Sequence, residues 1–162
     1  MNTKEAGDTM RTIGLLTLVG LAAWGCGREG EESSKANMDA LMDPSDAAMS
    51  QQSPGKYRAR FETSKGVFVI EVDRASSPHG ADRFYNLVRH GFYNDQRFFR
   101  VVQKFIVQFG MHGDPEVSAA WAEATIKDDP VKGSNERGTI TYAKPGSGVD
   151  NRTTQLFLNL KH

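Results

Sequence analysis

The chain has 162 residues, of which 38% are hydrophobic and 25% charged, so it can form one ordinary soluble domain but not two of average size. Its 20 basic and 20 acidic residues give a formal net charge of zero. A neutral chain has no overall field that would draw it to nucleic acid or to an anionic membrane surface, so we expect no nucleic-acid partner. The single cysteine, Cys26, excludes an intrachain disulfide and a cysteine-based metal cluster.

An apolar segment, residues 13–25, follows Lys4 and Arg11 and ends directly before Cys26. A helix that crosses a membrane needs about 20 apolar residues, so this shorter segment predicts the hydrophobic part of a secretory signal peptide. We therefore expect a signal peptide over residues 1–25.

The end of that segment, Ala23-Trp24-Gly25-Cys26, resembles the lipobox of bacterial lipoproteins. The resemblance implies that Cys26 is lipidated and anchors the protein in the bacterial cell envelope, facing the periplasm. Gly27 stands where such proteins carry aspartate when they stay in the inner membrane, so the outer membrane is slightly favoured. An ordinary signal peptide followed by a chance cysteine is the alternative.

Residues 26–56 are rich in small, polar and acidic residues and contain Pro44 and Pro54. Such a composition cannot bury enough apolar surface to offset chain entropy, so it predicts a flexible tether, with at most a transient helical turn at 37–42. As a coil, the tether would hold the domain about 30 Å from its lipid.

The folded domain is expected over residues 57–162 and to consist mainly of strands. Alternation of apolar and polar residues over 57–62 and a β-branched run over 67–72 predict a hairpin. Further strands are expected at 97–102, 105–109, 139–143 and 155–160. One amphipathic helix is expected to begin after Ser77 and to end at Gly91, and a second short helix is possible at 118–126, where Trp121 would pack on the sheet. Several short strands with few helices favour a closed antiparallel β-barrel.

Two motifs in this domain carry a resemblance. The segment from Phe98 to Gly110, Phe-Phe-Arg-Val-Val-Gln-Lys-Phe-Ile-Val-Gln-Phe-Gly, resembles the signature of cyclophilins. Gly138-Thr139-Ile140-Thr141-Tyr142-Ala143 and Thr154-Gln155-Leu156-Phe157-Leu158 are similar to two later segments of the same family, in the same order. The resemblance implies a mostly β, closed antiparallel barrel of cyclophilin type with one or two capping helices, and peptidyl-prolyl cis/trans isomerase activity. Because cyclophilins continue beyond the last of these segments, we expect that the last strands and a second helix are missing from this chain.

Rotation about a peptide bond has a barrier of about 18–20 kcal/mol because amide resonance is lost in the twisted transition state. The prolyl nitrogen then regains a lone pair, and a fixed guanidinium beside it would stabilise the transition state more than the planar ground state. Arg100 is the candidate for that group. One charge-assisted hydrogen bond contributes about 1.5–3 kcal/mol, or one to two decades of rate. The remainder has to come from an apolar pocket that binds the proline ring.

The resemblance assigns roles to further residues. Phe105 and Gln108 join Arg100 as catalytic residues, and Gln108 would contact the substrate backbone and help to hold the guanidinium. The substrate-binding groove would be lined by Ile106, Tyr142, Ala143, Gln155 and Phe157. Phe99, Ile106, Tyr142 and Lys144 depart from the residues that are usual in the family, and the last two are expected to alter the preference for the residue before proline.

The four histidines show no metal-ligand spacing, so we expect no metal and no cofactor. The expected partners are proline-containing polypeptides of the cell envelope or secreted proteins, bound by a monomer. Two alternatives remain open. The domain could be a proline-peptide binding module or chaperone without turnover, or an inert envelope lipoprotein that keeps only the scaffold.

Overall fold

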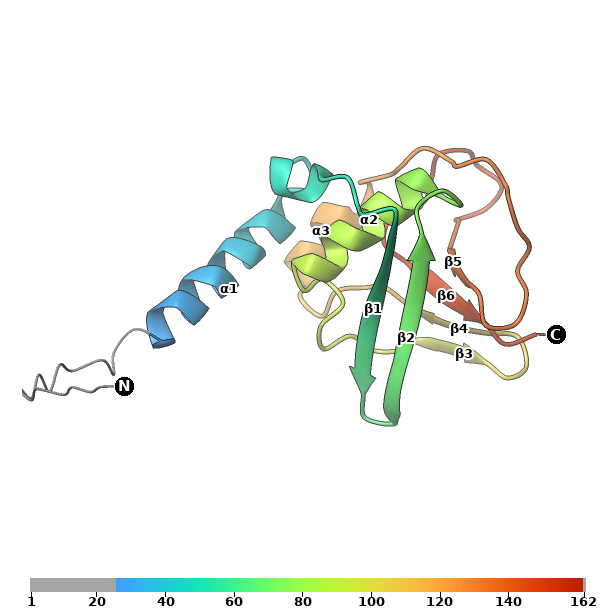
Figure 1. Cartoon of the computed structure of the whole chain (residues 1–162), viewed down its shortest axis with the longest axis horizontal. Coiled ribbons are helices and arrows are strands. Elements are labelled where there is room, and N and C mark those ends of the chain that lie inside the picture. The colour runs from blue at the N-terminus through green and yellow to red at the C-terminus, as the bar shows by residue number, and fades with distance from the viewer. Residues whose placement is uncertain (1–25, 162) are drawn as a thin grey trace, which may run out of the picture.

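A computed structural model describes residues 26–161 of the chain (Figure 1). No helix in this described part is long and apolar enough to cross a membrane. The predicted signal peptide, residues 1–25, lies outside the described residues. In chain order the elements are α1 (Cys26–Met42), the 3-10 helix η1 (Ala47–Ser50), β1 (Lys56–Thr63), β2 (Gly66–Asp73), α2 (Pro78–Arg89), β3 (Arg100–Val102), β4 (Ile106–Phe109), α3 (Pro115–Ala122), β5 (Ile140–Tyr142) and β6 (Leu156–Asn159).

Strands β1 and β2 form the predicted antiparallel hairpin. Ala59 lies opposite Ile70, and Phe61 lies opposite Phe68. Because successive side chains of a strand point to opposite faces, these apolar residues share one face of the hairpin. Ala59 and Ile70 are buried there, while the exposed valines Val67 and Val69 belong to the other face. The alternation in the sequence therefore predicted both the hairpin and the face that meets the core.

The other four strands form a second antiparallel sheet in the order β3-β4-β6-β5. All strand pairings are antiparallel, as predicted, but within residues 26–161 no hydrogen-bonded ladder joins this sheet to the hairpin. The described strands thus pair as two antiparallel sheets, and their closure into a barrel stays a prediction. The expectation of a mostly β chain is also met only in part, because α1 adds 17 helical residues.

The hydrophobic core lies between the two sheets and α2. Phe61 of the hairpin packs edge-on against Phe109 of β4, with ring centroids 5.8 Å apart, and Tyr93 contacts the same phenylalanine at 5.7 Å. Phe84 of α2 stacks on Phe61 from the helix side. Edge-to-face aromatic contacts add stability beyond that gained by burying apolar surface. Aromatic packing therefore holds together the two sheets, which no strand pairing joins in the described part of the chain.

Helix α2 begins and ends as the sequence predicts, after Ser77 and before Gly91. Gly91 has a φ of 76°, the left-handed conformation that favours glycine after a helix. The cap at the beginning, however, comes from elsewhere in the chain. The carboxylate of Asp129 accepts hydrogen bonds from the backbone N–H groups of His79 and Gly80 and from the Ser77 hydroxyl. The loop that follows α3 is thereby fixed to α2.

The second predicted helix is present, but it begins earlier than expected. Pro115 occupies its first turn and Asp114 accepts a hydrogen bond from the backbone N–H of Glu116, so α3 covers Pro115–Ala122 rather than 118–126. Trp121 is 1% exposed. It packs against Phe92, which follows α2, rather than on a strand of the sheet as predicted, and its indole N–H donates to the carbonyl of Leu41 at 2.7 Å.

Part of the segment predicted to be a flexible tether is helical in the structure. Helix α1 projects from the body of the domain, and its final residues, with η1, lie against α3 and α2 (Figure 1). Leu41 is 2% exposed and Met49 is 5% exposed. Part of the segment for which composition predicted a flexible tether, residues 26–56, is thus helical and has buried contacts. Composition shows how few apolar residues this segment has, but it does not show that Leu41 and Met49 pack against the rest of the domain.

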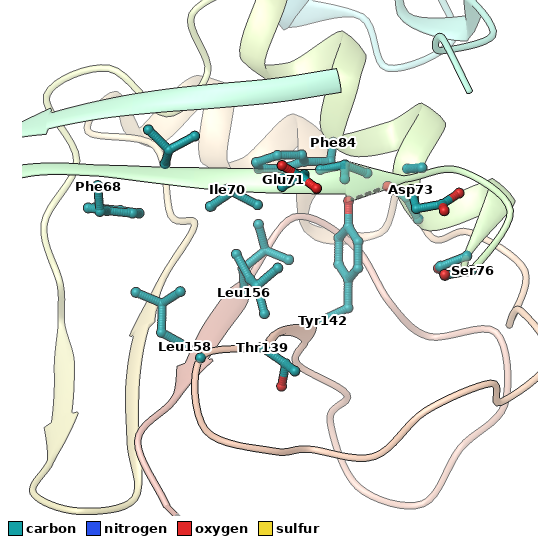
Figure 2. A pocket seen from close by; sticks show the side chains of 17 residues that line it. Phe68, Ile70, Glu71, Asp73, Ser76, Phe84, Thr139, Tyr142, Leu156 and Leu158 are labelled. Carbon is teal, nitrogen blue, oxygen red and sulfur yellow. Dashed lines mark hydrogen bonds between the residues drawn. The ribbon is translucent and has the colours of Figure 1, made fainter. Parts of the chain in front are cut away.

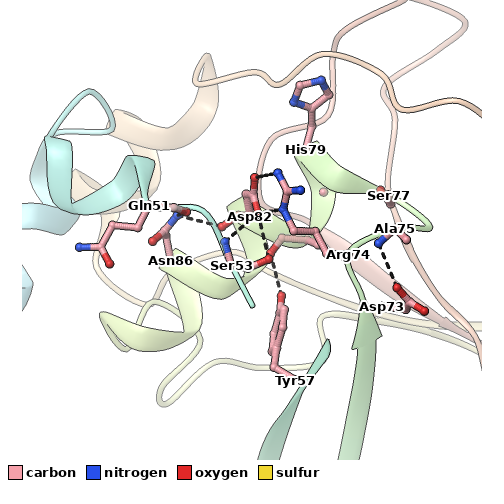
Figure 3. Close-up of polar contacts among 12 residues, drawn as sticks. Gln51, Ser53, Tyr57, Asp73, Arg74, Ala75, Ser77, His79, Asp82 and Asn86 are labelled. Atoms are coloured by element: carbon pink, nitrogen blue, oxygen red, sulfur yellow. Dashed lines mark hydrogen bonds and ion pairs between the residues drawn. The ribbon is translucent and has the colours of Figure 1, made fainter. Parts of the chain in front are cut away.

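A carboxylate on α2 holds the end of this segment. Asp82 accepts hydrogen bonds from the backbone N–H and the hydroxyl of Ser53, both at 2.9 Å, and two from the Arg74 guanidinium, both at 2.8 Å (Figure 3). Burial raises the pKa of Asp82, but the hydrogen bonds from Arg74 and Ser53 and the charge of Arg74 outweigh it and hold the pKa below its usual value. Asp82 thus joins α2, the end of β2 and the chain that precedes β1.

Candidate active site

The predicted catalytic arginine lies on the edge strand of the four-stranded sheet. Arg100 is the first residue of β3 and lies directly opposite Gln108 of β4. Its guanidinium is exposed and donates a hydrogen bond to the side-chain oxygen of Gln108 at 3.3 Å. The positive charge is thus available to a ligand, while one donor of the fork is held by the sheet.

Gln108 is held in turn by Gln155. The amide NH₂ of Gln108, which is 8% exposed, donates to the side-chain oxygen of Gln155 at 3.0 Å. An amide side chain has one accepting end and one donating end, so this bond directs the oxygen of Gln108 toward Arg100. The three predicted residues therefore form one chain of hydrogen bonds, which we call the relay: Arg100, Gln108 and Gln155.

Strand pairing decides which other side chains share a face with the relay. Gln108 lies opposite Phe157 of β6, and Phe157 lies opposite Thr141 of β5. Directly opposite residues of antiparallel strands point to the same side of the sheet. Arg100, Gln108, Phe157 and Thr141 therefore form a row across this face, in which half-buried Phe157 supplies an apolar surface beside the polar groups.

Two further predicted site residues of the first motif, Phe105 and Ile106, lie where the turn after β3 leads into β4. Phe105 precedes β4 and is 46% exposed, so it is not a core residue and can contact a ligand. Its carbonyl accepts from the backbone N–H of Leu160, which fixes its position. Ile106 lies on the same face as Gln108, two residues away, but it is only 4% exposed. The structure therefore places Phe105, but not Ile106, where a substrate can reach it.

Tyr142 points away from the relay. It lies opposite Leu156, one position along from the row that contains Thr141, so its side chain is on the other face of the sheet. Its hydroxyl donates to the carbonyl of Gly80 on α2 at 3.1 Å, and burial raises its pKa well above the usual range. The prediction that Tyr142 lines the groove beside the relay is not met, because the alternation of the strand directs it inward.

The same inward face borders an apolar cavity of about 530 Å³ between β2 and β5–β6 (Figure 2). Phe68 and Ile70 of the hairpin line one side of it, and Leu156, Leu158 and Tyr142 line the other. None of the relay residues borders this cavity. It lies between the two sheets, and it is separate from the face on which the predicted catalytic residues meet.

Ala143 reaches the site through its backbone. Its N–H donates to the carbonyl of Gln155 at 2.9 Å, so it continues the pairing of β5 with β6 and lies beside the relay. The next residue, Lys144, was expected to alter the groove. Its ammonium group is paired with Asp128 at 2.6 Å, and hydrogen bonds from Lys144 and from the N–H of Asp150 hold the pKa of Asp128 low.

Thr141 belongs to the site row although neither motif assigns it a role. Thr141 lies opposite Phe157, and its hydroxyl donates to the side-chain oxygen of Asn135 at 2.8 Å. The signal was available in the alternation of polar Thr139 and Thr141 with apolar Ile140 and Tyr142. That alternation puts Thr141 and Tyr142 on opposite faces, and the strand pairing then places Thr141 on the face of Gln108.

No group of three or more potential metal-ligating side chains occurs within residues 26–161. Cys26, the predicted site of lipidation, is the first residue of α1. The chemistry that the described site offers is thus a held guanidinium, a chain of amides and two partly exposed phenylalanines. This set can bind a peptide and donate a hydrogen bond to it without breaking a covalent bond.

Comparisons with known proteins identify relatives of this chain. Residues 58–162 match the family described as cyclophilin type peptidyl-prolyl cis-trans isomerase/CLD. The chain is 34% identical over 101 residues to a peptidyl-prolyl cis-trans isomerase of Acinetobacter baylyi, covering 62% of this chain and 53% of that protein. It is 31% identical over 101 residues to peptidyl-prolyl cis-trans isomerase B of Escherichia coli, covering 62% of this chain and 60% of that protein.

A solved structure shows the same fold. The crystal structure of a cyclophilin type peptidyl-prolyl cis-trans isomerase of Cryptosporidium parvum superposes with a TM-score of 0.56 at 21% identity, covering 65% of this chain and 68% of that one. A second structure of that protein, determined in the presence of the dipeptide Ala-Pro, gives a TM-score of 0.54 at 20% identity, covering the same shares. The chain spans 53% and 60% of the length of the two bacterial relatives. The match to the family model over residues 58–162 includes every residue of the relay, and this chain belongs to the cyclophilin type peptidyl-prolyl cis-trans isomerase family.

Proposed function

We propose that this chain accelerates cis/trans exchange about Xaa-Pro peptide bonds. The observation that carries the proposal is the relay, which holds an exposed guanidinium on the same face of the sheet as Phe157. In the twisted transition state the prolyl nitrogen accepts a hydrogen bond that the planar ground state cannot accept. A donor that is already held in place stabilises the transition state selectively, since little reorganisation is needed.

The substrate class follows from the chemistry of the same face. Phe105 and Phe157 offer apolar surface for a proline ring, and the amide of Gln108 offers hydrogen bonds to the flanking backbone. The related Cryptosporidium protein has been studied with the dipeptide Ala-Pro, which supports a short Xaa-Pro segment as the ligand. All residues of the relay come from one chain, so the proposed active form is a monomer.

The test is exchange spectroscopy of an Ala-Pro peptide with the purified chain. We expect broadening of the cis and trans signals that is lost in Arg100→Ala and weakened in Arg100→Lys, because an ammonium group cannot donate both to Gln108 and to the substrate with the geometry of a fork. Arg97→Ala is the matched control, since Arg97 is an exposed arginine three residues earlier. Removal of one charge-assisted hydrogen bond predicts a loss of about one to two decades in kcat/KM.

Two results would contradict the proposal. If the folded wild-type chain produced no exchange broadening and did not bind the peptide, the domain would be an inert scaffold. If it bound the peptide without Arg100-dependent exchange, it would be a binding module or chaperone for proline-containing segments. Peptide titration measured alongside the exchange separates these outcomes.

We also propose that the protein acts in the bacterial cell envelope, facing the periplasm, with its lipid on Cys26 and with secreted or outer-membrane proteins as substrates. The lipobox-like segment before Cys26 supports this localisation. Mass spectrometry of the protein expressed in a bacterial host tests it. A diacylglyceryl adduct on Cys26 that is absent from Cys26→Ser is expected, and an unmodified mature N-terminus would contradict it.

A further inference from the structure

A glutamine outside the recognised motifs joins two segments of the site. Gln96 lies in the loop between α2 and β3, four residues before Arg100. Its amide NH₂ donates to the carbonyl of Phe92 at 2.5 Å, and its oxygen accepts from the backbone N–H of Gly110 at 3.0 Å. Gly110 directly follows β4, two residues after Gln108. One half-buried side chain thus ties the approach to β3 to the end of β4.

This tie continues into a buried chain of hydrogen bonds that follows the relay. The carbonyl of Gly110 accepts from the Thr154 hydroxyl at 2.9 Å, and the carbonyl of Thr154 accepts from the Tyr93 hydroxyl at 3.0 Å. Thr154 precedes Gln155. These hydrogen bonds begin and end in the loop between α2 and β3, at Gln96 and Tyr93, and they involve residues that lie one to four positions along the chain from each residue of the relay.

Strand β3 needs such support. It is the edge strand of its sheet and only three residues long, and its pairing with β4 begins at Arg100. Within the described residues, no ladder hydrogen bond holds the chain before Arg100 in place. Phe98 packs against Phe68 and Phe109 in this stretch, and the two hydrogen bonds of Gln96 add a polar restraint. These bonds require both ends of an amide, because Phe92 offers an acceptor and Gly110 a donor.

We propose that Gln96 is a positioning residue for the isomerase reaction, which holds the start of β3 against Gly110 and thereby sets the position of the Arg100 guanidinium relative to Gln108. This inference rests on the proposed function, but the placement of Arg100 can be measured without it. Gln96 acts through Arg100, and it does not need to touch the substrate.

The test uses two variants of nearly the same shape in the full chain. Gln96→Met keeps the length and packing of the side chain but removes both hydrogen bonds, and Gln96→Glu keeps the acceptor for Gly110 but loses the donor to Phe92. We expect kcat to fall about tenfold in both, because small displacements of a catalytic group carry large costs in rate. We expect KM to change less than about twofold, since the surfaces that bind the peptide remain.

The spectroscopic readout is the side-chain Nε–H signal of Arg100 in a ¹H–¹⁵N spectrum, which is expected to shift in both variants. Gln103→Met, at an exposed glutamine in the turn of the β3–β4 hairpin, is the matched control and should leave kcat and the signal unchanged. Folded variants with wild-type kcat and an unshifted Arg100 signal would overturn the inference, and so would the loss of folding in both. If wild type shows no Arg100-dependent exchange, the proposed function fails, while a shift specific to the Gln96 variants still supports the positioning role.

Discussion

Replacing Asp82 with asparagine should lower the free energy of unfolding more than the loss of one exposed ion pair would. The carboxylate accepts four hydrogen bonds, two from Ser53 and two from the guanidinium of Arg74. Asparagine can keep the bonds to its remaining oxygen, but its NH₂ group then faces a donor of Arg74 (Figure 3). The Asp82 and Arg74 side chains are 26% and 28% exposed, so water compensates in part. We expect the free energy of unfolding to fall by about 2–4 kcal/mol.

The loss of stability in Asp82→Asn should depend on pH. The pKa of Asp82 in the folded state lies below its usual value of 3.8, because hydrogen bonds and the charge of Arg74 outweigh the effect of burial. A carboxyl group of this kind contributes its stability above the pKa of the unfolded chain and loses it as the pH falls through the folded value. The difference between wild type and Asp82→Asn should therefore be complete at pH 7 and decrease below about pH 4.

Urea unfolding followed by circular dichroism at pH 7, 5 and 3 measures this difference. Glu71→Gln is the control, because Glu71 pairs with Arg58 on the surface, where the two side chains are 67% and 74% exposed, and such a pair contributes little. Equal urea midpoints for wild type and Asp82→Asn at pH 7, or a difference that increases toward acid, would refute the role assigned to this carboxylate.

Three further substitutions test other parts of the structure. Leu41→Ala should lower the free energy of unfolding by about 2–5 kcal/mol in urea titrations, because the side chain is 2% exposed. Met42→Ala should change it little, because Met42 is 42% exposed. Equal losses of stability in the two variants would show that the end of α1 does not pack on the domain. Gly110→Ala should lower the free energy of unfolding by at least about 2 kcal/mol, because φ is 107° and a Cβ would lie 2.5 Å from a backbone oxygen. Gly113→Ala is the control, because a Cβ there meets nothing within 4 Å, and it should have the melting temperature of wild type. Tyr142→Phe should cost about 1 kcal/mol through the loss of one hydrogen bond and leave kcat/KM unchanged; a large loss of activity would instead place Tyr142 in the substrate groove.

Much of the candidate site could be predicted from the spacing of residues along two strands. Arg100 and Gln108 are eight residues apart around a tight turn, so an antiparallel pair brings them opposite each other. Gln155 could be added only through the resemblance to a family, since 47 residues separate it from Gln108 and local patterns do not reveal which strands pair. Tyr142 was misplaced because the resemblance supplied the segment but not its face, which the alternation of side chains decides.

The fold was predictable where the signal is local and unpredictable where a distant residue supplies the partner. The hairpin and the limits of α2 follow from alternation, from Ser77 and Pro78, and from Gly91. Their connections do not. Asp129, which caps α2 from 49 residues away, lies in a stretch that reads as an ordinary surface loop. A hydrogen-bond partner so far along the chain leaves no trace in local composition.

The amino-acid sequence by itself determined the strands, the amphipathic helix and the family to which the chain belongs, because these depend on the order and periodicity of neighbouring residues. Only the tertiary structure decided that residues 40–53 pack on α2 and α3, that Tyr142 points inward, and that Gln96 ties β3 to β4. Each of these depends on a group that meets its partner across space. A buried indole, carboxylate or amide needs a hydrogen-bond partner, but the sequence around it does not specify which residue that partner is. The fold decides which groups lie within hydrogen-bonding distance.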